Sequence, residues 1–308
     1  MSVLYTRTVT MKYLQKISIY VVALLLPIML VPQFVQAQTA DRATLIELIA
    51  LLQQQIVLLQ AQLEDQQAGL VSDDGLLDDF PGTVVANYAV QSELELPQRA
   101  PFQHQKYADQ LRMVFPSKYR DYVDQFVVFS DHSDDISAFV AVTSDGRDTT
   151  WMYGVDVEEI NADPTKAASV ELMVHEFAHV FTLDQFITSS GQISNCHEYF
   201  DETGCYSAGT YLSEFVQEFW NDALLDEVIQ ATKNRNSNRA LFELYEQYES
   251  DFVTDYAATD PAEDFAETFA WYVLGEEVER GSMAAQKIRF MDSFAQIRDY
   301  KEEILSNI

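Results

Sequence analysis

Basic residues are scarce in this sequence of 308 residues. It has 19 lysines and arginines against 49 aspartates and glutamates, which gives a formal net charge of −30 at pH 7. A field of this sign repels nucleic acid and anionic membrane surfaces, so we expect neither as a partner. It would attract a basic substrate, although an acidic surface also serves solubility alone.

Cysteine is also scarce, and no repeat of 20 to 50 residues is visible. Two cysteines in a chain of this length exclude a small disulfide-stapled domain. In an exported chain, Cys196 and Cys205 first predict one disulfide. The alternative is a zinc role together with His197, but their spacing fits no familiar zinc motif.

Acidic residues are absent from residues 1–37, which carry three basic residues. The apolar run 17–31 is short for a membrane span and contains a proline. A small-x-small cleavage site follows at Val35-Gln36-Ala37. These features predict a secretory signal peptide over 1–37 and an exported protein, either secreted or associated with the cell envelope. An uncleaved anchor is the alternative. Since no cysteine follows this segment, a bacterial lipoprotein is not expected.

The next segment, residues 38–68, carries a heptad pattern. Its apolar seam is spaced 4, 3, 4, 3, 4 and consists of Leu45, Ile49, Leu52, Ile56, Leu59 and Leu63. This pattern predicts a coiled coil and self-association through residues 45–63. A single amphipathic helix packed on the globular domain is the alternative. Residues 69–82 are rich in aspartate and glycine and form a linker candidate, so we place the start of the globular domain at 83.

The globular part has the pattern of an α+β domain. Strand-like runs at 126–130, 138–143 and 149–157 predict a small, mostly antiparallel sheet. Helical spacing covers 106–125 with a break at Pro116, then 211–231, 239–250, 260–274 and 283–305. We therefore divide the domain into a sheet with one long helix (83–183) and a helical subdomain (184–308). The second or third strand could form an edge that pairs with an extended peptide.

Glycine and proline are absent between Pro164 and Gly191, and this stretch contains the motif His175-Glu176-Phe177-Ala178-His179. Asp163 and Pro164 predict the start of a helix. Residues four apart share one helix face, so His175 and His179 can direct two imidazoles at one Zn²⁺. Glu176 can then take a proton from a water on the metal.

A third histidine ligand is missing at the usual distance, because Thr182 and Gln185 stand where glycine and histidine would be needed. Downstream, Asp260 and Pro261 predict the start of another helix, with Glu263 in its first turn. Glu267 follows at i+4 on the same face. Glu263 is suited to be an oxygen ligand with the Glu267 carboxylate behind it, although either glutamate could bind the metal.

Together, His175-Glu176-Phe177-x-His179 and Tyr256…Glu263-x-x-Ala266-Glu267-x-Phe269 resemble the gluzincin-type zinc metallopeptidases. The catalytic domain of anthrax lethal factor and its bacterial relatives are the most similar. The resemblance covers residues 170–183 and 255–274. Asp264 departs from it, since an apolar residue is expected there.

The resemblance implies a zincin-like domain and a definite set of roles. Zn²⁺ would be bound by His175, His179 and Glu263. Glu176 would be the general base, and Tyr256 would stabilise the oxyanion. The implied function is an exported zinc metalloendopeptidase that acts on peptides or proteins.

Two other functions stay open. One is an envelope-attached, oligomeric binding or scaffold protein with a structural or degenerate metal site. The other is a zinc hydrolase, such as an amidase, that acts on a different substrate. A closed structural site would need a fourth protein ligand and no base, which separates the scaffold from the enzymes.

Overall fold

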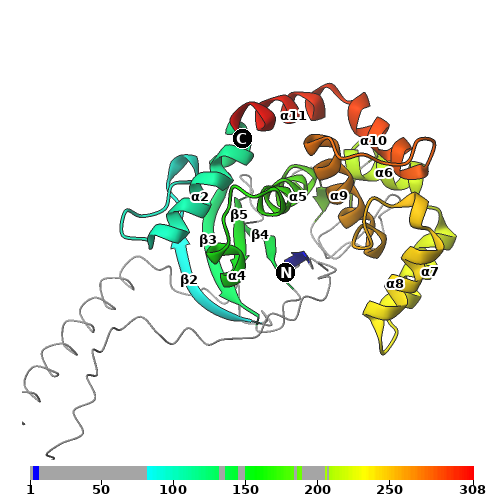
Figure 1. Ribbon diagram of the computed structural model, residues 1–308, viewed down its shortest axis with the longest axis horizontal. Coiled ribbons are helices and arrows are strands. Elements are labelled where there is room, and N and C mark those ends of the chain that lie inside the picture. The colour runs from blue at the N-terminus through cyan, green and yellow to red at the C-terminus, as the bar shows by residue number, and fades with distance from the viewer. Residues whose placement is uncertain are drawn as a thin grey trace, which may run out of the picture. The chain divides into compact units, whose positions relative to one another are not determined.

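A computed structural model describes residues 3–6, 82–131, 136–144, 150–183, 186–188, 205–206 and 208–308 (Figure 1). All of them belong to one compact unit, which consists of residues 1–9 and 69–308. The predicted coiled coil, nearly all of the predicted signal peptide and the predicted linker up to residue 81 lie outside the described residues. Within the described residues, no helix is long and apolar enough to span a membrane.

The domain contains an α+β arrangement around one mixed sheet. Its strand order is β1-β4-β5-β3-β2, with bounds β1 Val3–Thr6, β2 Thr83–Ala89, β3 Val123–Ser130, β4 Ala138–Ser144 and β5 Thr150–Asp156. The pair β3–β5 is parallel, and the other pairs are antiparallel. The sheet is therefore mostly antiparallel, as predicted. Because β1 lies within the predicted signal peptide, cleavage would leave β4 as the edge strand.

The strands bury apolar side chains on both faces, because successive residues of a strand point to opposite sides. On β3, Phe126 and Val128 join the main core, whereas Val127 and Phe129 join a second cluster on the opposite face. Gly154 is required by this packing. It lies opposite Phe139 in the β4–β5 ladder, and a Cβ at position 154 would meet the Phe139 ring at 2.2 Å.

Four helices of the described part of the chain accompany the sheet. Two are longer, α2 Phe102–Val114 and α5 Ala167–Leu183, and two are short, α3 Ser117–Arg120 and α4 Val157–Asn161. The segment after α5 forms a small ladder of β6 Phe186–Thr188 and β7 Cys205–Tyr206. The chain continues with α6 Tyr211–Phe219, α7 Asp222–Thr232, α8 Ser237–Gln247, α9 Pro261–Leu274, α10 Met283–Ser293 and α11 Ala295–Asn307. Short 3₁₀ turns occur at η1 Ser92–Leu94, η3 Glu249–Asp251 and η4 Ala257–Thr259.

Several predicted helix boundaries are wrong. The expected helix 211–231 is divided at Trp220 and Asn221, and the Asn221 side chain accepts a hydrogen bond from Leu224 N to begin α7. The expected helix 283–305 is likewise divided at Phe294. The first predicted helix, 106–125, is also misplaced: α2 begins at Phe102, and α3 ends at Arg120.

Helix α5 occupies the middle of the domain, between the sheet with α2 on one side and α9 on the other (Figure 1). Its aromatic side chains Phe177 and Phe181 pack against Phe269 of α9 and Tyr300 of α11. Aromatic pairs at these distances add to the burial of apolar area and fix the helices side by side. The packing of α5 against α9 brings residues far apart in sequence together.

Candidate metal centre

Helix α5 carries the histidine motif and is buried along the motif. The predicted core stripe of Val170, Val174, Phe177 and Phe181 is buried, and so are the two histidines, each 1% exposed. The helix begins at Ala167, so Asp163 is not its cap. Instead, the Asp163 carboxylate accepts hydrogen bonds from Thr165 and pairs with Lys106.

Helix α9 begins as its sequence predicts. The Asp260 side chain accepts a hydrogen bond of 2.7 Å from Ala262 N, and Pro261 is the first helical residue. The helix ends at Leu274 and is capped by Gly275, whose φ of 76° is in the left-handed region that glycine tolerates. Glu263 and Glu267 therefore lie on consecutive turns, and their carboxylates reach the histidines of α5.

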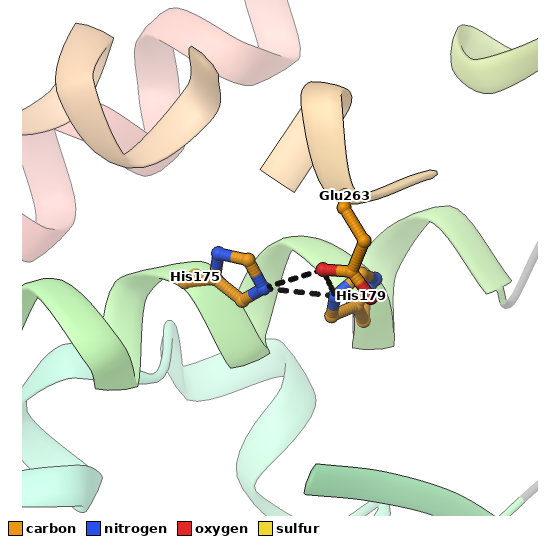
Figure 2. A group of neighbouring side chains, drawn as sticks. All are labelled: His175, His179 and Glu263. Carbon is orange, nitrogen blue, oxygen red and sulfur yellow. Dashed lines mark hydrogen bonds and ion pairs between the residues drawn. The ribbon is translucent and has the colours of Figure 1, made fainter. Parts of the chain in front are cut away.

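Three donor atoms meet where α5 faces α9, as Figure 2 shows. Glu263 Oε2 lies 3.1 Å from His175 Nε2 and 3.3 Å from His179 Nε2. The two Nε2 atoms are 3.0 Å apart. Neighbouring ligands of a tetrahedral zinc ion are separated by about 3.3 Å, so the donor set fits such an ion. The three residues could therefore hold a metal ion.

Glu267 lies behind the donor set and contacts the other ring nitrogen. Its Oε1 is 2.6 Å from His175 Nδ1, and its Oε2 accepts a hydrogen bond of 2.6 Å from Thr254 Oγ1. Thr254 Oγ1 also accepts a hydrogen bond from Ala257 N. A carboxylate at Nδ1 favours the tautomer that leaves Nε2 for a metal. The geometry thus favours Glu263 as the candidate ligand and Glu267 as the group that orients the His175 ring.

The charges of this cluster stabilise one another. Burial raises the pKa of Glu263, but the charge of His179 and the hydrogen bonds from both histidines outweigh it, so that the pKa falls from 4.5 to about 2. Burial lowers the pKa of His175, yet its hydrogen bonds to Glu263 and Glu267 hold that pKa well above 6.5. Without a metal, a proton on His175 offsets the buried carboxylates, and a divalent cation would replace it.

Of the two predicted catalytic groups, Glu176 directly follows His175 in α5, and Tyr256 lies beside the His175 ring. Glu176 is fully buried, and Tyr256 is 8% exposed, with its ring centroid 6.0 Å from that of His175. A pair of buried phenols, Tyr107 and Tyr153, is joined by a hydrogen bond of 3.1 Å. Burial raises the pKa of both phenols, and the charge of Glu176 raises it further. These tyrosines therefore stay neutral beside Glu176.

Sequence reasoning did not find Thr254, Tyr107 or Tyr153, because none of them belongs to a local motif. Cys196 and His197 lie outside the described residues, and Cys205 pairs with Thr188 in the β6–β7 ladder. The disulfide between Cys196 and Cys205 stays a prediction.

No protein-family model, no curated protein and no solved structure matches this chain. Its function is therefore inferred from its own residues.

Proposed function

We propose that this chain is a zinc metallopeptidase with a zincin-like domain, similar to the gluzincins. The observation that carries the proposal is the convergence of three donor atoms from α5 and α9, with Glu267 supporting His175 from behind. Two imidazoles and one carboxylate are three protein ligands, the number that catalytic zinc sites have. Glu176, the residue after His175, provides a base that a purely structural site would not need.

In this mechanism His175 Nε2, His179 Nε2 and Glu263 Oε2 would hold the zinc ion. When bound, the zinc ion supplies a Lewis acid for the scissile carbonyl and lowers the pKa of water. The Glu176 carboxylate takes the proton of the attacking water and later delivers it to the leaving amine. The Tyr256 hydroxyl donates a hydrogen bond to the oxygen on which negative charge develops.

The edge of β4 is the proposed place for the substrate. This strand contacts α5, and its outer edge pairs antiparallel with β1 from Val3↔Ala141 to Thr6↔Ala138. An extended peptide could add to the same edge in the same direction, with main-chain hydrogen bonds that align its scissile bond. The net charge of −30 favours a basic peptide. Export, a disulfide and self-association through residues 45–63 belong to the same proposal.

The test compares wild-type protein with Glu176→Gln by zinc content and by digestion of a peptide library. We expect about one zinc per chain in both, and loss of most turnover in the variant, because glutamine cannot accept the proton of water. Full activity in Glu176→Gln would refute the mechanism. If both proteins bind zinc but the wild type cleaves no peptide, the result would contradict a peptidase and favour the scaffold or a zinc hydrolase with a different substrate.

The burial of the centre favours a second candidate function, in which a structural metal site stabilises an envelope-attached scaffold. His175, His179 and Glu263 are each at most 5% exposed. A structural site, however, has four protein ligands, and the described residues supply a group of three. X-ray absorption of the zinc-loaded protein separates the two functions, since a coordinated water supports the peptidase and a fourth protein ligand supports the scaffold.

A further inference from the structure

An ion pair without access to water lies directly beside the proposed ligand Glu263. The next residue of α9, Asp264, has its Oδ2 2.6 Å from Lys287 Nζ of α10. The side chains of the two residues are 0% and 1% exposed. The indole Nε1 of Trp220 donates a hydrogen bond of 2.8 Å to the same carboxylate, and Thr268 Oγ1 donates one of 3.3 Å.

Lys287 is held by groups other than Asp264 as well. Its Nζ donates a hydrogen bond of 2.6 Å to the backbone oxygen of Asp251 and lies 4.1 Å from the centroid of the Phe252 ring. The ammonium group therefore has a fixed position, set by the segment that precedes η4 and by α10. Any movement of Asp264 away from this position would leave a buried charge without its partner, which costs far more than the pair itself contributes.

A buried ion pair is a poor source of stability. Its two charges must leave water, and apolar side chains of similar volume often serve equally well or better. Asp264 therefore contributes orientation more than stability, because an ion pair has a definite direction that an apolar contact lacks.

The geometry of a helix connects this pair to the metal ligand. Consecutive residues are separated by about 100° around the axis, so Glu263 and Asp264 project from one rigid turn in different directions. A rotation of α9 by about 10° would move a side-chain atom at the helix surface by about 1 Å. Metal–ligand distances tolerate deviations of about 0.2 Å, so such a rotation would misplace the Glu263 carboxylate.

We propose that the Asp264–Lys287 ion pair is a positioning device that sets the rotation of α9 and thereby holds Glu263 at the metal. This inference rests on the proposed zinc site and names what fixes its third ligand. Asp264 and Lys287 contact neither substrate nor metal in this proposal, and they act only through Glu263.

The test removes both charges at once, in the double variant Asp264→Asn/Lys287→Met of the full chain. This change avoids an orphaned buried charge, keeps the volume nearly constant and leaves an amide oxygen that can accept the hydrogen bond from Trp220. We measure the melting temperature of the metal-free protein by circular dichroism and the zinc dissociation constant by competition with a chromophoric chelator. The control removes the exposed α8 pair with Arg239→Gln/Glu243→Gln, whose side chains are 74% and 57% exposed.

We expect the double variant to melt near the wild-type temperature while its zinc dissociation constant rises at least tenfold. The control should change neither quantity. X-ray absorption of the zinc-loaded double variant should show fewer carboxylate contacts, as a displaced Glu263 requires. If this variant does not fold, Asp264→Asn/Lys287→Gln, which keeps hydrogen-bonding groups at both positions, takes its place with the same expectations.

Unchanged zinc affinity in a folded double variant would overturn the inference and leave the zinc site intact. A loss of zinc affinity accompanied by a lower melting temperature would also overturn it, because general destabilisation would then explain the loss. Wild-type protein that binds no zinc would overturn the proposed function itself, and the inference with it.

Discussion

Replacing Glu263 by glutamine should weaken zinc binding much more than replacing Glu267, because the two carboxylates meet opposite nitrogens of His175. Glu263 Oε2 contacts both Nε2 atoms, whereas Glu267 Oε1 contacts Nδ1. A zinc site with four ligands binds with about 10–16 kcal/mol, or about 2.5–4 kcal/mol for each ligand. Loss of the Glu263 carboxylate should therefore weaken binding by two to three orders of magnitude, at about 1.4 kcal/mol for each.

Glu267→Gln should have a smaller effect. Glutamine can still accept a hydrogen bond from His175 Nδ1, but it loses the charge that makes the ring a better ligand. Changes of this kind cost about 10- to 100-fold in metal affinity. The side chain of Thr254, which donates to Glu267 Oε2, can also accept a hydrogen bond from the new amide, so the fold should tolerate the variant.

The assay is a competition between the protein and a chromophoric chelator for zinc at pH 7.5, with the exposed Glu214→Gln as the control. The control should bind like the wild type. A loss in Glu267→Gln equal to or greater than that in Glu263→Gln would refute the assignment of the ligand and move it to Glu267. Wild-type affinity in both variants would show that zinc binds elsewhere.

Three further predictions concern the metal-free protein, turnover and packing. The pKa of Glu263 falls from 4.5 to about 2 on folding, so its contribution to stability is present above about pH 4.5 and is lost as the pH falls towards 2. This pKa difference corresponds to about 3 kcal/mol of stability. Between pH 6 and pH 3, the free energy of unfolding measured with urea should therefore fall less in Glu263→Gln than in the wild type. Tyr256→Phe should lower kcat about 100-fold and leave zinc affinity unchanged, whereas an unchanged kcat would remove Tyr256 from the mechanism. Gly154→Ala should destabilise the domain by about 1–3 kcal/mol because the new methyl group meets the Phe139 ring, and adding Phe139→Leu should restore part of the melting temperature.

The parts of the centre that could be predicted from sequence are those encoded locally. His175 and His179 are one helical turn apart, so their common face follows from the period of the helix. Asp260 and Pro261 specify the start of α9 within two residues, and the structure has the helix beginning there. The role of Glu263 in the first turn of α9 follows from that start.

Local signals fail where the tertiary structure uses the same residues differently. Asp163 and Pro164 have the sequence of a helix start, but the Asp163 carboxylate bonds to Thr165 and Lys106, and α5 begins only at Ala167. The apolar spacing of 211–231 continues through Trp220, but the helix stops there, and the indole donates a hydrogen bond to Asp264. In both places local hydrogen bonds are joined by a contact distant in sequence, with Lys106 in the first and with Asp264 in the second.

Asp264 shows why sequence pattern alone gives an incomplete account of such a centre. By the resemblance to the gluzincins an apolar residue is expected at this position, so the charge of Asp264 makes the surroundings of Glu263 look less suited to a metal. Its partner Lys287 lies on another helix, in a segment with no motif of its own. Once that partner is known, the same departure becomes a reason for α9 to have one orientation rather than several. A substitution that looks unfavourable beside a ligand can therefore be the residue that fixes the ligand, and only its long-range contacts distinguish the two cases.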